Sequence, residues 1–186
     1  MSITSDILSS IKLDSGRFGS ALVSQQVLSG NSIRDTEWIK STILVLIGFA
    51  VYQLIVRRYV TFTKSLADYN LENATENFIK FGTMLIISRA LSGRKLNDSN
   101  WLFEIYTILA GFLFYDTVVS HGYSYLVSKY NLSCKSSLVL YDVMQFGTMF
   151  TVSRWLSGQP MNYEWVFSST TYIIGIALYD YFFGKC

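Results

Sequence analysis

Long apolar runs separated by short polar clusters dominate the pattern of the chain. Three runs, each 19 residues long, are nearly continuous: residues 38–56, 101–119 and 165–183. A helix needs about 20 mainly apolar residues to cross the hydrocarbon core of a bilayer. Each run begins with a tryptophan directly after a polar cluster, which combines helix N-cap chemistry with an interfacial aromatic anchor. The anchors are Trp38, Trp101 and Trp165. The pattern predicts three membrane-spanning helices, and buried helices of a soluble protein are the alternative.

A second, less apolar segment precedes each of these runs. The segments cover residues 18–28, 78–91 and 136–156, and the first is the least apolar. Each ends in Leu-Ser-Gly, and a glycine at this place can adopt the left-handed conformation that stops a helix. Only six or seven residues then lead to the next tryptophan. So short a loop makes the two helices antiparallel neighbours. The pattern therefore predicts three helical hairpins, or about six helices.

The three hairpins are copies of one unit. Residues 81–93 contain Phe-Gly-Thr-Met and then Ser-Arg-x-Leu-Ser-Gly, and residues 146–158 contain both motifs again. A more divergent copy, with Phe-Gly-Ser and Leu-Ser-Gly, occupies residues 18–30. A fixed period of this kind indicates a repeat architecture. We predict an all-α polytopic membrane protein with a single domain over residues 1–186 and pseudo-threefold repeats. The repeats cover about 18–58, 78–120 and 136–184.

Repeat-equivalent polar residues are the first candidates for function. Fifteen residues after each tryptophan stand Gln53, Asp116 and Asp180. A carboxylate near a helix C-terminus opposes the helix dipole, so each aspartate should have a cationic partner. The candidates are lysines or arginines on the face that holds both termini, such as Arg57, Arg58 or Lys129. Acids within a membrane can mark ion or proton paths, and contacts that tie neighbouring repeats together at the headgroup boundary are the alternative.

Two further sets of repeat-equivalent residues suggest structural roles. Four residues before each helix-ending glycine stand Gln26, Arg89 and Arg154. The arginines lie about 6 Å from the helix end, so we expect them to reach the membrane interface. A glycine precedes a tyrosine by four residues on the second helix of every repeat, and such pairs share one helix face. These residues are Gly48, Gly111, Gly175, Tyr52, Tyr115 and Tyr179. Small residues allow close helix approach, so this face should pack between hairpins.

Composition and charge agree with a membrane protein. The chain is 51% hydrophobic and only 15% charged, whereas about a quarter of the residues of a soluble domain are charged. A net charge of +2 without a basic run does not indicate nucleic-acid binding. The predicted face that holds both termini carries nine Lys and Arg residues and the opposite face carries four. The positive-inside rule then places both termini in the cytoplasm or the virion interior.

Motifs for catalysis are missing from the sequence. It contains no nucleotide-binding loop, zinc motif or nucleophile elbow, and His121 is its single histidine. Cys134 and Cys186 are too few for a disulfide framework or a metal site, and we expect free thiols in a reducing compartment. We therefore predict a protein that is not an enzyme and has no cofactor or metal. Its expected partners are membrane lipid and other proteins, including further copies of itself.

The units at 81–93 and 146–158 resemble small polytopic repeat membrane proteins of nucleocytoplasmic large DNA viruses. The resemblance covers these two short blocks. It implies a non-enzymatic structural protein of a viral inner membrane or virion, which links the membrane to the capsid or to other membrane proteins. A small channel or transporter with a polar path between the repeats is the alternative. Gln53, Asp116 and Asp180 would line that path, so the orientation of these side chains distinguishes the two hypotheses.

Overall fold

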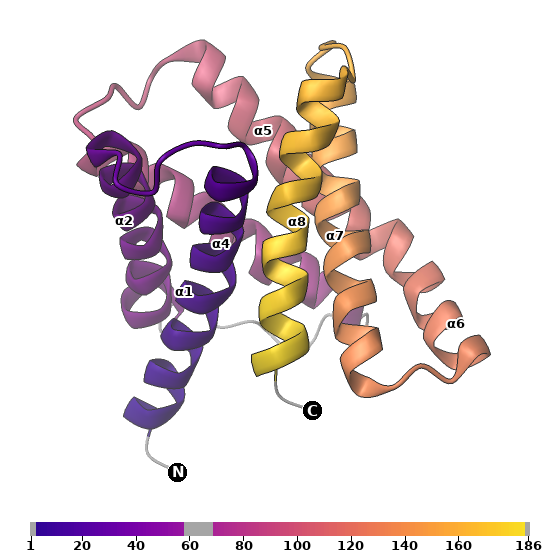
Figure 1. Cartoon of the computed structure of the whole chain (residues 1–186). Helices are drawn as coiled ribbons and strands as arrows, with labels where there is room; N and C mark the ends of the chain where they lie inside the picture. The colour runs from indigo at the N-terminus through magenta and orange to yellow at the C-terminus, as the bar shows by residue number, and fades with distance from the viewer. Residues whose placement is uncertain (1–2, 58–68, 185–186) are drawn as a thin grey trace.

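The computed structural model describes residues 3–57 and 69–184 (Figure 1). Within these ranges the regular structure is entirely helical and contains no strand. The prediction of an all-α fold with six helices is confirmed. The six helical rods are α1 (Ile3–Leu28), α2 (Thr36–Val51) with the π-helical turn η1 (Tyr52–Val56), α4 (Tyr69–Leu91), α5 (Ser99–Phe114) with the π-helical turn η2 (Tyr115–Val119) and α6 (Ser120–Tyr130), α7 (Cys134–Leu156), and α8 (Tyr163–Phe183).

The first helix of each repeat begins earlier than its apolar segment predicted. Helix α1 begins at Ile3 instead of residue 18, and α4 begins at Tyr69 instead of residue 78. The apolar segments therefore cover only part of these helices, and the helix of the first repeat is among the longest. The reason is that hydropathy marks only the apolar part of a helix. Polar residues such as Asp14 continue α1 because protein surrounds them, since Asp14 is only 2% exposed.

The predicted helix ends are confirmed. The glycines after α1, α4 and α7 have positive φ angles of 73°, 70° and 65°, which an L-residue with a side chain rarely adopts. They are Gly30, Gly93 and Gly158. The residue before each second helix caps its N-terminus through a side-chain oxygen, as predicted. These caps are Asp35, Asp98 and Asn162. Local chemistry therefore defines the loop between the two helices of every repeat.

The repeats pack in a closed cycle. The second helix of each repeat packs more extensively on the first helix of another repeat than on its own partner. Helix α2 packs on α4, α5 packs on α7, and α8 packs on α1. Figure 1 shows α8 beside both α7 and α1. Because the last repeat contacts the first, the bundle closes on itself.

Six residues at repeat-equivalent positions form the centre of the core, and we call them the aromatic cluster. They are Phe18, Phe49, Phe81, Phe112, Phe146 and Ile176. Phe18 stacks on Phe49 with ring centroids 4.2 Å apart, and Phe81 stacks on Phe112 at 3.9 Å. The rings of Phe18, Phe81 and Phe146 meet one another edge to face at 5.6–6.4 Å. All three repeats therefore meet at this cluster.

Two helices of the described residues are long and apolar enough to cross a membrane. They are Thr36–Val56 and Ser99–Tyr130. The run at residues 165–183, which the sequence pattern also placed in a membrane, is not among them. Four consecutive Ser and Thr residues at 168–171, together with Asp180, lower its hydropathy. Two such helices are weak evidence for a membrane protein, since buried helices of soluble proteins also qualify.

Candidate functional site

A buried group of polar residues lies one helical turn from the aromatic cluster, and we call it the polar cluster. The first helix of each repeat contributes two members, which lie four residues and one residue before its phenylalanine of the aromatic cluster. The second helix contributes one member, which lies four residues after its residue of the aromatic cluster. Residues four apart share one helix face, so the same faces carry both clusters. The members are Asp14, Arg17, Gln53, Asn77, Lys80, Asp116, Asp142, Gln145 and Asp180. The four carboxylates among them are each at most 5% exposed.

Within each repeat, the polar cluster pairs a residue of the first helix with a residue of the second. Gln53 Nε2 donates to Asp14 Oδ2 at 2.8 Å in the first repeat. Asn77 Nδ2 donates to Asp116 Oδ2 at 2.9 Å in the second. In the third repeat the equivalent positions are both acids, Asp142 and Asp180, and both carboxyl groups contact the guanidinium group of Arg17. The third repeat therefore has an acid where the others have an amide donor.

Cations connect the repeats. Lys80 of α4 donates from Nζ to Asp14 Oδ1 of α1 at 2.5 Å. Arg17 of α1 donates from Nη2 to Asp142 Oδ1 of α7. Its Nε lies 3.0 Å from Asp180 Oδ2 of α8, an ion-pair distance at which the N–H direction is misaligned for a hydrogen bond. At the equivalent position of the third repeat Gln145 donates to the hydroxyl of Tyr141 at 2.9 Å. Among the residues that the structure describes, two of the three junctions between repeats thus contain an ion pair.

The partner of Asp180 is a cation from the expected face of the bundle, but it is none of the three residues named as examples. Asp180 pairs with Arg17 on α1. Arg57 instead donates to Gln53 Oε1 at 3.0 Å, and Lys129 lies over the rings of Tyr125 and Tyr130. The third candidate, Arg58, lies outside the described residues. The available signal was the repeat itself, because the residues one and four positions before each Phe-Gly motif are polar in all three copies.

The second polar set holds the interhelical loops. Gln26, Arg89 and Arg154 each donate from the side chain to the backbone oxygen six residues later, at 2.9–3.0 Å. Both arginines also lie over the tryptophan that begins the next helix, Arg89 at 4.7 Å from the ring centroid of Trp101 and Arg154 at 5.9 Å from that of Trp165. All three predicted anchor tryptophans are half-buried. This set is separate from the polar cluster and stabilises the opposite end of the bundle.

Asp98 has one more interaction than its equivalents. It caps α5 by accepting from the backbone N–H of Trp101, and it also accepts from Arg89 Nη2 at 2.8 Å. These hydrogen bonds favour the ionised carboxylate. They hold the pKa of Asp98 below its ordinary value, with the Trp101 bond as the largest cause.

The three glycines of the second helices lie where backbones touch. A Cβ atom on Gly111 would lie 2.6 Å from the backbone oxygen of Met149, and one on Gly48 would lie 2.7 Å from that of Met84. A Cβ atom on Gly175 would lie 2.5 Å from the backbone oxygen of Ser20. Each contact joins two repeats. Of the neighbouring tyrosines, Tyr52 and Tyr115 are fully buried, and the half-buried Tyr179 covers Gly16.

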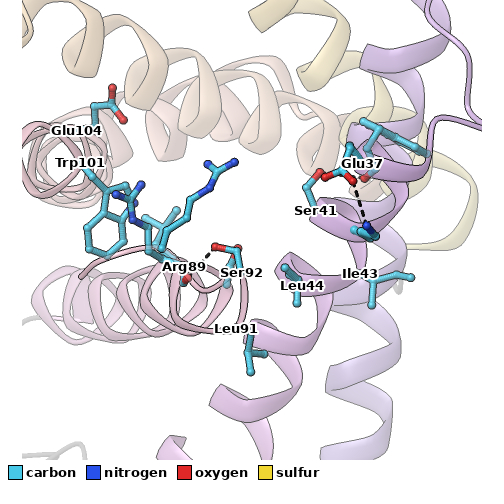
Figure 2. Close-up of a pocket in the computed structure, with 14 residues that line it drawn as sticks. Glu37, Ser41, Ile43, Leu44, Arg89, Leu91, Ser92, Trp101 and Glu104 are labelled. Carbon is cyan, nitrogen blue, oxygen red and sulfur yellow. Dashed lines mark hydrogen bonds and ion pairs between the residues drawn. The ribbon is translucent and has the colours of Figure 1, made fainter. Parts of the chain in front are cut away.

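A cleft of about 920 Å³ lies between α2 and the α4–α5 pair. Figure 2 shows Arg89 and Trp101 on one wall and Glu37 and Ser41 on the other. Lys40 on this cleft pairs with Glu37 at 3.0 Å, and Arg89 pairs with Asp98. These charges are therefore neutralised within the protein, and the cleft presents no buried unpaired charge.

The remaining candidates for chemistry are few. No group of three or more His, Cys, Asp or Glu side chains that could hold a metal occurs among the described residues. Cys134 is disulfide-bonded, so the expectation of a free thiol is wrong for this residue. Cys186 lies outside the described residues. The polar cluster is thus the candidate site with the most buried charge.

No family model, curated protein or solved structure matches the chain. Fold and site must therefore define the class of protein. They define an all-α bundle of three sequence repeats that closes around an aromatic cluster and a buried polar cluster.

Proposed function

We propose that the chain is a non-enzymatic integral membrane protein with a structural role. Its six helices form three hairpins about a pseudo-threefold axis. The observation that carries the proposal is the inverted polarity of the bundle. Large apolar side chains face outward on α8, where Leu178 is 52% and Phe182 is 66% exposed, while Asp142 inside the bundle is fully buried. Contiguous exposed apolar surface is rare on soluble monomers, but it suits lipid, and charges in membrane proteins pair inside the bundle.

The central packing favours the structural role over a channel. Rings from all three repeats touch in the aromatic cluster, on the line along which a path between the repeats would run. Gln53, Asp116 and Asp180 contact Asp14, Asn77 and Arg17 of the protein. Each repeat-equivalent polar side chain therefore has a protein partner, as contacts that hold helices together require.

A place in a viral inner membrane or virion completes the proposal. The support is the resemblance of the units at 81–93 and 146–158 to viral polytopic repeat proteins. The protein would link the membrane to the capsid or to other membrane proteins through its more basic face. Mass spectrometry of purified virions and of their stripped membranes tests this part. Absence of the protein from both fractions would contradict it.

Membrane insertion is tested by alkaline carbonate extraction and by labelling single cysteines from each side. The background carries Cys134→Ser and Cys186→Ser, and because it removes the disulfide of Cys134, its control is helical content equal to that of the wild type. Asn31→Cys lies in the loop after α1, and Asn131→Cys lies in the loop after α6. We expect the chain to resist extraction, Asn131→Cys to react from the cytoplasmic side and Asn31→Cys from the other. Extraction into the soluble fraction would contradict the membrane proposal, and labelling of both sites from one side would contradict the six-span topology.

Ion flux distinguishes the structural protein from the channel. We expect liposomes that contain the wild-type protein to show no flux above empty liposomes. A selective flux that both Asp116→Asn and Asp180→Asn abolish would favour the channel instead.

A further inference from the structure

The acids of the third repeat have a hydrogen-bonding problem that the other repeats do not have. Asp142 Oδ2 and Asp180 Oδ1 are buried and have no hydrogen-bond partner among the described residues. The side chain of Asp142 is 0% exposed and that of Asp180 is 6% exposed, so neither reaches bulk water. Two ionised carboxylates only accept hydrogen bonds and cannot bond to each other. A buried acceptor without a donor destabilises the fold.

The first two repeats show what the third pair lacks. There an amide N–H of Gln53 or Asn77 donates to the carboxylate across the same helix pair. A proton on one of the two carboxyl groups would supply the equivalent donor in the third repeat. It would replace repulsion between like charges with an O–H···O hydrogen bond.

The charges around the pair also require one proton. Arg17 on α1 is the one cation that the described residues pair with Asp142 or Asp180. The other titratable groups near the pair are Tyr115 of η2, Tyr141 of α7 and Tyr179 of α8, and tyrosines are neutral below about pH 9. Lys12 of α1 lines the same cavity as Asp180, but its side chain is exposed and pairs with neither acid. Two ionised carboxylates and Arg17 would leave one negative charge in the core, and a single proton removes it. A metal ion fits less well because the guanidinium group already contacts both carboxylates.

We propose that Asp142 and Asp180 form a proton-binding site, in which the two carboxyl groups share one proton and Arg17 balances the remaining negative charge. The proposal does not depend on the membrane, because it rests on contacts inside the bundle. Loss of the proton would make the two acids repel each other between α7 and α8, beside the α1–α8 contact at which the cycle of repeats closes. The site therefore couples proton concentration to the stability of the third repeat.

A cavity of about 560 Å³ connects the site to one end of the bundle. Arg17, Tyr141 and Asp180 lie at its inner part, and Lys12 also lines it. Its outer lining includes Leu8, which is 53% exposed. The aromatic cluster closes the opposite side, so the proton exchanges with the face at which α1 begins and α8 ends.

Infrared spectroscopy of the purified protein in detergent detects the shared proton directly. We expect the wild type at about pH 7 to show the carbonyl absorption of a protonated carboxyl group, which an ionised carboxylate lacks. Asp142→Asn and Asp180→Asn should each remove the same component of that absorption. Asp14→Asn is the matched control, because Asp14 is equally buried but both its oxygens have donors. Asp116→Asn shows whether part of the protonated-carboxyl absorption comes from the acid of the second repeat.

Thermal unfolding supplies a second measurement. If the folded chain holds a proton that the unfolded chain releases, the wild-type melting temperature should fall as the pH rises above about 4, the ordinary pKa of aspartate, until the folded chain also releases the proton. Asp180→Asn should abolish most of this fall, since asparagine supplies a permanent donor. Asp14→Asn should lower the melting temperature at every pH because it removes the anion that pairs with Lys80. The absence of protonated-carboxyl absorption in the wild type overturns the proposal, and this result does not require that the variants fold. An equal loss of this absorption in Asp14→Asn, or a wild-type melting temperature independent of pH, overturns it as well.

Discussion

The aromatic cluster and the polar cluster lie one turn apart on the same helical rods, yet the repeat fills them differently. Phenylalanine occupies five of the six positions of the aromatic cluster, and Ile176 occupies the sixth. The polar cluster has nine repeat-equivalent positions, and no set of three holds one residue type throughout. One set is Asp14, Asn77 and Asp142, and another is Arg17, Lys80 and Gln145.

Physical differences between packing and charge explain this contrast. Three identical rings can meet at the centre of a cycle, because edge-to-face contacts are favourable for every pair. Three identical charges cannot, because like charges in a core of low dielectric constant repel strongly. A threefold repeat can therefore keep its apolar core uniform, but it must vary its buried charges until each has a partner. The pair of Asp142 and Asp180 is the place where that variation leaves two acids together.

Removal of Arg17 should have the largest effect on this balance. Arg17→Met leaves Asp142 and Asp180 buried without their cation, and removal of one partner from a buried ion pair costs about 3–5 kcal/mol. We expect a loss of this size in the free energy of unfolding, measured by denaturant titration in detergent. The control is Lys12→Met, which changes an exposed cation on the same helix. Equal losses in the two variants would show that the cluster does not depend on Arg17.

Truncation in the aromatic cluster should have an effect of similar or slightly smaller size. Phe81 contacts four other rings of the cluster. Phe81→Ala should therefore lower the free energy of unfolding by about 3–5 kcal/mol, and by less if the surrounding residues relax into the cavity. Phe112→Ile copies the third repeat, which has Ile176 at that position, and should cost less. The same unfolding measurement compares them. If Phe112→Ile were as damaging as Phe81→Ala, the positions would not be equivalent in packing.

Two glycines of the same chain should respond to alanine with opposite signs. Gly111→Ala forces a Cβ atom against the backbone of Met149 and should destabilise the bundle by about 1–3 kcal/mol. Gly147 lies in the middle of α7, where a Cβ atom would meet nothing within 4 Å. Gly147→Ala should stabilise the protein by about 0.5–1 kcal/mol through helix propensity. Stabilisation by both changes would mean that α5 and α7 are not in backbone contact.

Features that depend on residues close in sequence could be predicted, and contacts between distant residues could not. Helix ends such as the Asp35 cap and Gly30 depend on neighbours within a few residues, so the motifs sufficed. The repeat placed Gly111 on a face that should pack between hairpins, and the structure brings that glycine against Met149. The partner of Asp180 could not be found this way, because Arg17 lies far away in sequence and meets it only when the cycle closes.

Hydropathy understates the length of α1 for a related reason. Hydropathy treats Asp14 and Arg17 as interruptions, whereas the folded bundle surrounds both with partners on other helices. A pattern that assumes lipid or water around every residue cannot anticipate a protein-lined polar interior. Alignment of the three repeats is the part of the sequence that does carry this information.

The smallest expected effect on stability concerns the equivalent arginines Arg89 and Arg154, which each donate a hydrogen bond to a backbone oxygen of the loop between two helices. Gln26 makes the same side-chain contact to a backbone oxygen as the arginines do, so glutamine fits this position. Arg154→Gln should therefore keep the contact to Pro160 and lose the hydrogen bond from Arg154 Nη1 to Gln159 Oε1, at a cost of about 0.5–1.5 kcal/mol. Arg89→Gln should cost more, because Arg89 also pairs with Asp98.

The pH dependence of that difference identifies its source. The pKa of Asp98 lies below its ordinary value in the folded protein, so its contribution to stability is present above the ordinary value. That contribution is lost as the pH falls through the lowered pKa, since the protonated acid no longer attracts Arg89. Arg89→Gln should therefore lower the melting temperature more than Arg154→Gln near neutral pH, and this difference should decrease as the pH falls. Thermal unfolding of both variants across the acidic range measures it. A constant difference would assign it to the closer stacking of Arg89, which lies 4.7 Å from the ring centroid of Trp101 whereas Arg154 lies 5.9 Å from that of Trp165, and this stacking does not titrate.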